Sequence, residues 1–404
     1  MDETSGQGPA AGEGKQRPSP RKSHARPLSP YLKSTIFLLV FLALASLFAI
    51  PMGLSQALST MMNTAYRLLV DTCLYIMALA VLAGAVSALL SEFGVIELLN
   101  KILSPLMGPL FGMPGAAALG VVTTYLSDNP AILTLAKDKN YRRYFKAYQI
   151  PALTNLGTGF GMGLIVTSFI LGLEAKAGPQ VGLAALCGNL GAIAGCILST
   201  RLMLHYTAKD MGRTAPASDL DSPSDMAEQP RQGSRNVWLR ALNALMDGGK
   251  KGVDLGLGII PGVLVVCTFV MMLTNGPSAA GYTGAAYEGI ALLPQLAAKI
   301  DFILKPLFGF SSPAGIAVPV TALGSAGAAM GIIPNLIRTG QAGCGDLAVF
   351  TAMCMCWSGF LSTHVSMMDV LGCSRFTGKA IGAHTLGGLL AGIVAHWLYI
   401  LFTL

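Results

Sequence analysis

The stretch GVVTTYLSDNPAIL (residues 120–133) places a serine, an acid, an amide and a proline side by side inside apolar sequence. Pro130 lacks a backbone N–H and restricts Asn129, so SDNP is predicted to interrupt or kink its helix. Helix ends freed in this way can meet a polar ligand, with Asp128 as an acceptor and Asn129 as both donor and acceptor. In the alternative interpretation, SDNP is a turn at the membrane surface and Asp128 caps the following helix.

The composition around this stretch is that of an all-α, polytopic integral membrane protein. Of 404 residues, 53% are hydrophobic and 12% are charged, and the mean hydropathy is +0.59. The chain contains several apolar runs that are long enough to cross a bilayer as helices. Spans are expected near residues 32–55, 68–91, 147–173, 180–205, 253–274, 347–372 and 380–402.

Polar and Pro-rich segments divide the chain into five parts. Residues 1–30 are predicted to be a disordered basic cytoplasmic tail, and residues 31–56 the first transmembrane helix. The segment 57–206 is predicted to hold a first repeat with a following span, and 252–404 a second repeat with the final span. The polar segment 207–251 is interpreted as a cytoplasmic linker. The eight cysteines lack CxxC spacing and are predicted to be buried thiols.

An internal repeat is indicated by an ordered recurrence of short patterns. The pair Arg67 and Asp71 is matched by Lys250 and Asp254, at an offset of 254 minus 71, or 183. The sequence PLFG at 109–112 recurs at 306–309, at an offset of 309 minus 112, or 197. The same offset pairs Thr124 with Thr321 and Leu126 with Leu323. Such ordered recurrence is typical of a duplication, and the two acid–base pairs are interpreted as local ion pairs.

The distribution of cations predicts opposite orientations for the two repeats. Lysines and arginines cluster in segments 137–146 and 201–251, which should be cytoplasmic, whereas the loop 275–289 has none and should be outside. With the tail inside, the spans at 68–91 and 253–274 then run in opposite directions. Inverted repeats with broken or re-entrant helices are typical of secondary transporters, in which both breaks meet at the midplane.

Polar residues near the expected breaks are the candidate site. The candidate substrate-binding residues are Thr124, Ser127, Asp128, Asn129, Asn155, Thr158, Thr321, Ser325, Asn335, Ser362 and Thr363. Candidate coupling residues are His364 and Asp369, because an ionisable group within a span is costly and marks a pathway. The alternative for Ser and Thr is a bond to the carbonyl of the preceding turn, and His384 and His396 are interpreted as packed neutral side chains.

Motifs of enzymes that hydrolyse ATP or peptides are missing from the sequence. It contains no GxxxxGK loop, no HExxH and no GxSxG. His364 and Asp369 are five residues apart and do not share a helix face well. The prediction is therefore a protein that is not an enzyme, with no cofactor and no bound metal.

The segments ILSPLMGPLFGMPG (102–115) and FILKPLFGFSSPAG (302–315), with the polar helices after them, resemble the nucleoside-recognition Gate domain family. That domain occurs in concentrative nucleoside transporters, in ferrous iron transport protein B and in spore maturation proteins A and B. The similarity covers about residues 65–175 and 250–372. It implies a bacterial inner-membrane protein with paired gate repeats. Matching site positions would be Thr124, Ser127, Asp128, Asn129, Thr321, Gly324 and Ser325.

Two features of these relatives are missing: the asparagine-rich stretch of the spore maturation proteins and the GTPase domain of the iron transporters. A nucleoside substrate therefore rests on the family alone. The predicted function is an inner-membrane secondary transporter for a small polar solute, nucleoside-like and coupled to protons or sodium, that alternates between its inverted repeats. The alternative is a non-transporting membrane scaffold or assembly factor. Expected partners are the substrate and the lipid bilayer, with homo-oligomerisation left open; the net charge of +7 is assigned to membrane orientation and not to nucleic acid.

Overall fold

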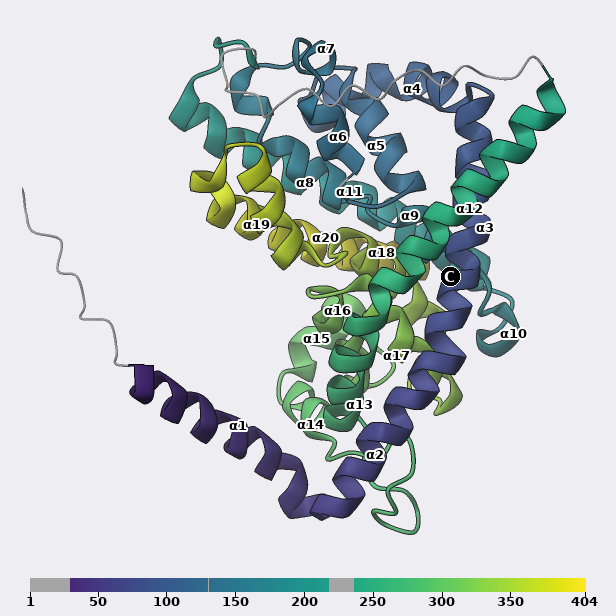
Figure 1. The fold of residues 1–404 in the computed structure, drawn as a ribbon, viewed down its shortest axis with the longest axis vertical. Coiled ribbons are helices and arrows are strands. Elements are labelled where there is room, and N and C mark those ends of the chain that lie inside the picture. Colours follow the sequence, from purple (N-terminus) through teal and green to yellow (C-terminus); the bar gives the residue numbers. More distant parts are fainter. Residues whose placement is uncertain (1–29, 130, 218–235) are drawn as a thin grey trace, which may run out of the picture. The chain divides into compact units, whose positions relative to one another are not determined.

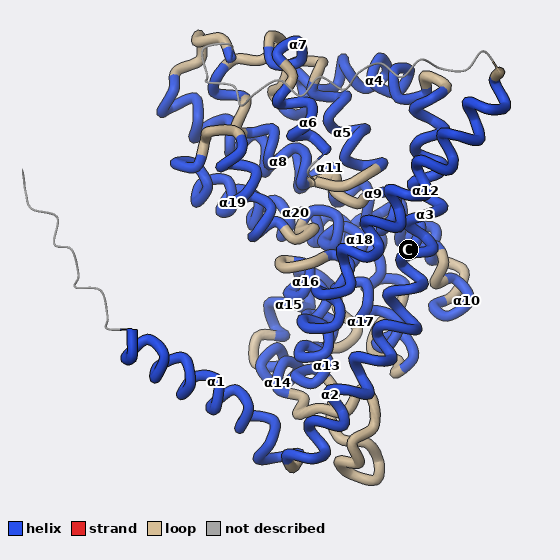
Figure 2. The backbone as a smooth tube through the Cα atoms, viewed as in Figure 1, coloured by secondary structure: helices blue, strands red, loops and turns tan. Residues whose placement is uncertain are grey.

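The structure, a computed structural model, describes residues 30–129, 131–217 and 236–404. These residues are helical or lie in connecting loops, and no strand forms among them (Figure 2). Seven helices within the described ranges are long and apolar enough to cross a membrane, or up to eight when one bent pair is included. The chain is therefore an all-α, multi-pass membrane protein. The predicted tail at 1–29, residue Pro130 and the linker segment 218–235 lie outside the described residues.

The helices of the first half precede the linker. They are α1 (Pro30–Met52), α2 (Leu54–Arg67), the π-helix η1 (Leu68–Cys73), α3 (Leu74–Glu92), α4 (Val95–Leu106), the π-helix η2 (Met107–Phe111), α5 (Ala117–Leu126), α6 (Ala131–Lys137), α7 (Lys139–Arg142), the 3₁₀-helix η3 (Ala147–Gln149), α8 (Ala152–Thr158), α9 (Gly163–Leu171), α10 (Glu174–Ala177) and α11 (Val181–Met211). Residues 1–47 form a unit of their own, and residues 48–404 form the second. The apolar side chains of α1 up to residue 44 are exposed, as expected of a helix that faces lipid.

The helices of the second half follow a similar order. They are α12 (Val237–Gly262), the π-helix η5 (Val263–Cys267), α13 (Thr268–Thr274), α14 (Leu292–Ala298), α15 (Asp301–Phe308), the 3₁₀-helix η6 (Pro313–Ile316), α16 (Ala317–Ala322), α17 (Ala326–Arg338), α18 (Cys344–Cys356), α19 (Phe360–Val370), the 3₁₀-helix η7 (Ser374–Phe376) and α20 (Thr377–Thr403). Helix α15 and the η6–α16 segment form the bent pair, at 76°.

Two long helices pack together through glycines. Helices α3 and α12 run side by side (Figure 1), and a Cβ at Gly248 would collide with the carbonyl of Gly84. In the same way, Gly252 lies on the carbonyl of Ala80. Membrane helices have little hydrophobic driving force for association, so small residues that allow close backbone approach stabilise such pairs. We call this pair the α3–α12 wall.

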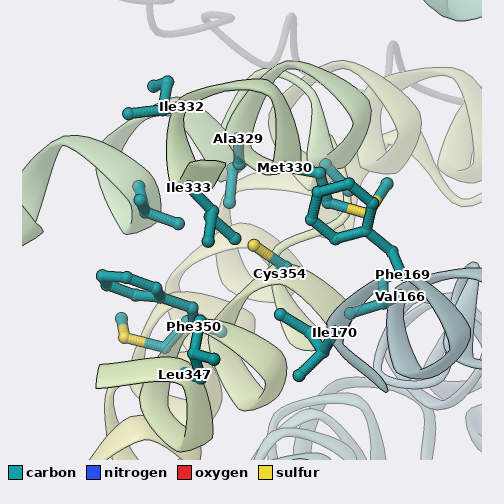
Figure 3. Packing of buried hydrophobic residues seen from close by; sticks show 14 of the residues in the cluster. Val166, Phe169, Ile170, Ala329, Met330, Ile332, Ile333, Leu347, Phe350 and Cys354 are labelled. Atoms are coloured by element: carbon teal, nitrogen blue, oxygen red, sulfur yellow. The ribbon is translucent and has the colours of Figure 1, made fainter. Parts of the chain in front are cut away.

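The largest hydrophobic core lies among α9, α17 and α18. Figure 3 shows Phe169 and Ile170 of α9 facing Met330 of α17 and Phe350 of α18, and all four are fully buried. Each such side chain contributes about 1.5–3 kcal/mol relative to an exposed position in water, and less in lipid. This packing holds α9, which begins at one of the chain breaks described below, and α18, which ends at the other.

The offset of 197 recurs in the local structure. Gly112 and Gly309, which end the two PLFG segments, have left-handed φ of 69° and 63°. Met162 and Gly359 are also 197 apart, with φ of 56° and 65°, and directly precede α9 and α19. A left-handed residue is a specific backbone choice, and Met162 adopts it without being glycine. The two halves thus share the same order of turns and helix starts.

The offset of 183 does not correspond to a structural match. The π-helices η1 and η5 contact each other and begin 263 minus 68, or 195, residues apart. Arg67 and Asp71 form the predicted ion pair at 3.6 Å. Lys250 instead lies 4.0 Å from Asp247, at i−3, so the local pair predicted with Asp254 is wrong.

The linker is shorter than predicted. Helix α11 continues to Met211 and α12 begins at Val237, so residues 207–211 and 237–251 are helical. The polar character of 237–251 reflects charged side chains at the start of a membrane helix, not a loop. The first described helix also ends at Met52, short of residue 56.

Candidate functional site

Helices α5 and α6 form a hairpin whose turn includes Ser127, Asp128 and Asn129. The helices pack together where Gly120 meets the Ile132 side chain. Helix α5 ends at Leu126 and α6 begins at Ala131, whose N–H donates to the carbonyl of Asp128 at 2.9 Å. We call this element hairpin 1. Residues 127–129 therefore make a turn, and the burial of Asn129 places its tip inside the protein, whereas the alternative interpretation expected a turn at the membrane surface.

Asn129 is inserted between two other segments of the chain. Its side chain is 1% exposed, and Nδ2 donates to the Ser358 carbonyl at 2.5 Å. Its Oδ1 points at Gly161, because a Cβ at Gly161 would overlap that oxygen. The Asp128 carboxylate accepts the Asn129 backbone N–H at 2.7 Å, so it holds the tip.

The two segments that Asn129 touches are breaks within membrane helices. Break 1, residues 159–162, separates α8 from α9, and break 2, residues 357–359, separates α18 from α19. Irregular backbone at membrane depth is tolerated only where protein or a water-filled cavity satisfies its polar groups. The Ser358 carbonyl is satisfied in this way by Asn129.

A second hairpin approaches break 2 from the other half. Helices α16 and α17 pack together, and Ser325 caps α17 by accepting the Ala328 N–H at 3.2 Å. The N–H of Gly359 donates to the Ala322 carbonyl at 3.0 Å. We call this element hairpin 2. Both hairpin tips therefore meet at break 2, although equivalent positions of the two hairpins are 197 residues apart in the sequence.

A cavity of about 1280 Å³ separates hairpin 1 from the α3–α12 wall. Thr123, Leu126 and Ser127 line it from hairpin 1, and Gly84, Gly248 and Gly252 line it from the wall. Its volume exceeds the ~300–1,000 Å³ of usual ligand pockets, as expected of a vestibule leading to a site. Ser127 is exposed to this space, and Asp128 is partly exposed.

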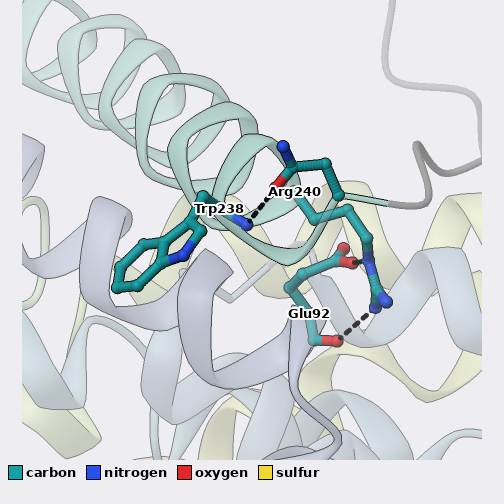
Figure 4. Close-up of polar contacts among 4 residues, drawn as sticks. Glu92, Trp238 and Arg240 are labelled. Carbon is teal, nitrogen blue, oxygen red and sulfur yellow. Dashed lines mark hydrogen bonds and ion pairs between the residues drawn. The ribbon is translucent and has the colours of Figure 1, made fainter.

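Charged side chains line one part of the cavity. The Arg240 guanidinium Nε lies 2.6 Å from the Glu92 carboxylate and joins the start of α12 to the end of α3 (Figure 4). Asp247, Lys250 and Lys251 line the same cavity from α12. The Arg240–Glu92 pair is about one third exposed, so it contributes on the order of 0–1 kcal/mol.

Eleven of the thirteen predicted site residues fall into three groups. Ser127, Asp128, Asn129 and Ser325 lie at the hairpin tips, and Ser362 and Thr363 lie in the first turn of α19, where both hydroxyls donate to the Gly359 carbonyl. Thr124, Thr158 and Thr321 donate to the carbonyl of their own preceding turn, as the alternative for threonine expects. Asn155 and His364 lie in a buried polar cluster below break 2.

Two predicted residues lie away from the tips. Asn335 is at the other end of α17, where it bonds Asn275 and Arg338. Asp369 is exposed near the end of α19 and accepts a hydrogen bond from Ser374 at 3.1 Å. The structure therefore does not bring Asn335 and Asp369 together with Asn129.

Sequence reasoning missed the breaks themselves and the charged wall of the cavity. The stretch TGFGMG (158–163) carries a glycine signal for break 1, and Ser358-Gly359 carries a weaker one for break 2. No local pattern in the sequence could indicate the pairing of Arg240 with Glu92, because the two residues are 148 positions apart. His384, interpreted as a packed neutral histidine, bonds Ser199 and the Cys356 carbonyl.

Comparison with known proteins finds similarity in fold. No protein-family model matches the chain, and no curated protein matches it in sequence. The chain is similar to solved structures of CNTnw, a concentrative nucleoside transporter. Two variants of CNTnw in outward-facing states match with TM-scores of 0.54 and 0.51, and the inward-facing substrate-bound state matches with 0.52. Identity is 14% in each case, over 90% of this chain and 89–91% of those chains.

These matches identify the class of fold. The chain has a fold like that of these nucleoside transporter structures, and it is an all-α, multi-pass membrane protein. The structural neighbours are transporters and not enzymes. Membership of the Gate domain family itself stays a prediction from the sequence.

Proposed function

We propose that this protein is a secondary transporter for a small polar solute and works by alternating access. The observation that carries the proposal is the meeting of two hairpin tips at break 2, beside a vestibule that reaches one of them. Broken helices that converge from two repeats place helix ends and unpaired backbone groups around one midplane site. A site that two separate bodies complete can open to either side in turn.

The side chains at the tips suit a ligand that carries hydroxyl groups. Ser127, Asp128, Ser325 and Ser362 are at least partly exposed around the tips and offer one carboxylate and three hydroxyls. A carboxylate accepts from two hydroxyls, and each serine both donates and accepts. A nucleoside, with its ribose and base amides, has this chemistry and is the substrate class that we propose.

The two hairpins differ in their contact with the α3–α12 wall, which supports an inward-facing state. Hairpin 2 packs closely on α12, because a Cβ at Gly327 would lie 3.0 Å from Ile259, and one at Gly262 would lie 3.3 Å from Ser325 Oγ. Hairpin 1 is separated from the wall by the cavity. The cations Arg240, Lys250 and Lys251 line that cavity, and cations gather on the cytoplasmic side.

In the inverted repeats that we propose, the outward-facing state is obtained by exchanging the positions of the two hairpins relative to the wall. In the outward-facing state, hairpin 1 would pack on the wall and hairpin 2 would leave it. The small side chains of Ser87, Ser91 and Ala244 on the wall line the cavity opposite hairpin 1. They would allow such close backbone approach without a change in the wall itself.

The test is thermal stabilisation of the purified full-length protein by a panel of nucleosides, nucleobases, amino acids and small carboxylates. A specific ligand raises the melting temperature by an amount set by its concentration over its Kd. We expect nucleosides to stabilise the protein, and Asp128→Asn to lose that stabilisation. Asp369→Asn is the matched control, because it removes a carboxylate away from the tips, and it should respond like the natural protein.

Two outcomes would overturn the proposal. A well-folded protein that no compound stabilises would favour the scaffold alternative. Equal loss of the response in Asp128→Asn and Asp369→Asn would show that the tip carboxylate has no special role.

A further inference from the structure

A buried chain of hydrogen bonds ends at Cys356, the residue that directly precedes break 2. Asn155 Nδ2 of α8 donates to Ser199 Oγ of α11 at 2.9 Å, and Ser199 Oγ lies 2.8 Å from His384 Nδ1 of α20. His384 Nε2 lies 2.5 Å from the Cys356 carbonyl, which can only accept. His384 therefore carries its hydrogen on Nε2 and accepts the serine hydroxyl at Nδ1. Both of its nitrogens are committed in the neutral form.

His364 of α19 lies against this chain without joining it. Its ring centroid is 4.7 Å from that of His384 and 5.5 Å from that of Phe360, and its side chain is fully buried. No side chain among the described residues pairs with either of its ring nitrogens, and the Phe360 carbonyl one turn back lies near the ring but outside hydrogen-bond geometry. Leaving such a group unpaired costs about 1–3 kcal/mol, so it needs an explanation beyond packing.

The neighbouring elements offer His364 no counter-charge. On its own helix, Asp369 is exposed and bonded to Ser374, and in η7 the Arg375 guanidinium lies over the Phe376 ring. In α20, Lys379 is paired with Asp210, and the His384 ring lies 4.7 Å from the His364 ring. Helix α8 presents Thr154 and Asn155, whose Oγ1 and Oδ1 are buried and lack partners in the described part of the chain.

Resting on the transport function proposed above, we infer that His364 is the proton-binding residue that couples transport to a proton gradient. An imidazole nitrogen of His364 takes a proton from water on one side of the membrane and returns it to water on the other, with no other bond formed or broken. His384 cannot take this role, because both of its nitrogens are already used. Two imidazolium ions 4.7 Å apart would also repel each other in an apolar setting.

Proton binding and the present packing exclude each other. An unpaired charge buried among Phe360 and His384 would cost several kcal/mol, so a protonated His364 requires water to reach it. Helix α19 is pinned at its start to hairpin 2 by the Gly359 N–H to Ala322 carbonyl bond and by the Leu361 N–H to Leu323 carbonyl bond, at 3.0 and 3.4 Å. Movement that hydrates His364 would strain these bonds, which links the proton to the position of hairpin 2.

The test measures the conformation as a function of pH and needs no known substrate. Full-length Ser127→Cys protein is placed in inside-out vesicles, and its rate of labelling by a membrane-impermeant maleimide is measured, corrected for the ionisation of free thiol. We expect the rate to fall about tenfold between pH 8 and pH 5, because protonation disfavours the inward-facing packing. His364→Asn should remove this pH dependence, and His205→Asn, at an exposed position of α11, should keep it.

The controls separate failure of the inference from failure of the proposed function. Protein without Ser127→Cys gives the background from the native thiols, and the melting temperature shows that His364→Asn folds; if it does not fold, His364→Gln is used. A pH dependence that persists in a folded His364 variant would overturn the inference and leave the transport proposal standing. Labelling that changes neither with pH nor with any nucleoside would contradict both.

Discussion

Asn129→Asp tests the contact between hairpin 1 and break 2 with almost no change in shape. The substitution replaces Nδ2, which donates to the Ser358 carbonyl at 2.5 Å, with an oxygen that cannot donate when ionised. The carbonyl would lose its partner and face another acceptor at a site where Asn129 is 1% exposed. Loss of a buried partner costs about 1–3 kcal/mol, or a factor of roughly 5 to 150 in an equilibrium constant.

The assay is thermal unfolding of the purified variant in detergent at pH 7.5, beside Ser127→Ala as the matched control. We expect the melting temperature of Asn129→Asp to fall by a few degrees, since 1 kcal/mol corresponds to roughly 2–4 °C in a large domain. Ser127→Ala removes an exposed hydroxyl two residues away and should melt with the natural protein. Equal melting temperatures for Asn129→Asp and Ser127→Ala would refute the reasoning.

Three further changes test the wall and the loop 275–291. Gly248→Leu should abolish the folded state, because its side chain would occupy the space of the Gly84 carbonyl. A normal yield on gel filtration together with a normal melting temperature in thermal unfolding would contradict this. Arg240→Gln should lower stability by no more than about 1 kcal/mol, and the loss should shrink in high salt, because the pair with Glu92 is partly exposed. Burial raises the pKa of Glu288, but hydrogen bonds from Thr283 and Gly284 outweigh it and hold the pKa below its ordinary value of 4.5. A lowered pKa gives stability that is complete above the unfolded value and is lost as pH falls through the folded value. Glu288→Gln should therefore melt lower than the natural protein at pH 7 and lose less stability as the pH falls from about 5 to about 3. Parallel pH curves would disprove the assignment.

The sequence was sufficient for the membrane spans, and it indicated an interruption of the helix at residues 127–129. Apolar length alone locates the helices, and an acid, an amide and a proline in such surroundings mark a turn whose polar groups need partners. The PLFG recurrence also led to the correct offset, because Gly112 and Gly309 both need a left-handed conformation that glycine adopts without strain.

The remaining features depend on contacts that sequence spacing does not contain. Asn129 reaches Ser358 across 229 positions, so no local pattern could assign the acceptor. Asn335 was included because it is polar and follows Ser325 in the sequence, but α17 continues for 13 residues and places it about 15 Å along the helix from Ser325. The start of α12 was interpreted as part of a linker because it is charged. The structure explains these charges, because the side chains line a cavity and do not face lipid.

The central claim is that the site opens alternately to the two sides of the membrane, and a disulfide lock on hairpin 2 tests it most directly. A Cβ at Gly262 would lie 3.5 Å from the Ser325 Cβ, which is within the range that a disulfide spans. Gly262→Cys with Ser325→Cys should therefore join hairpin 2 to α12 under oxidising conditions and hold the inward-facing state. The reporter is Ser127→Cys, labelled by an impermeant maleimide in inside-out and in right-side-out vesicles.

In this experiment the crosslink is formed first, and the reporter thiol is kept protected until labelling begins. The account predicts that the locked protein is labelled from the cytoplasmic side only, and that reduction of the disulfide restores labelling from outside. Each single cysteine variant should behave like the unlocked protein. Labelling of the locked protein from outside at the unlocked rate would contradict alternating access between these two hairpins.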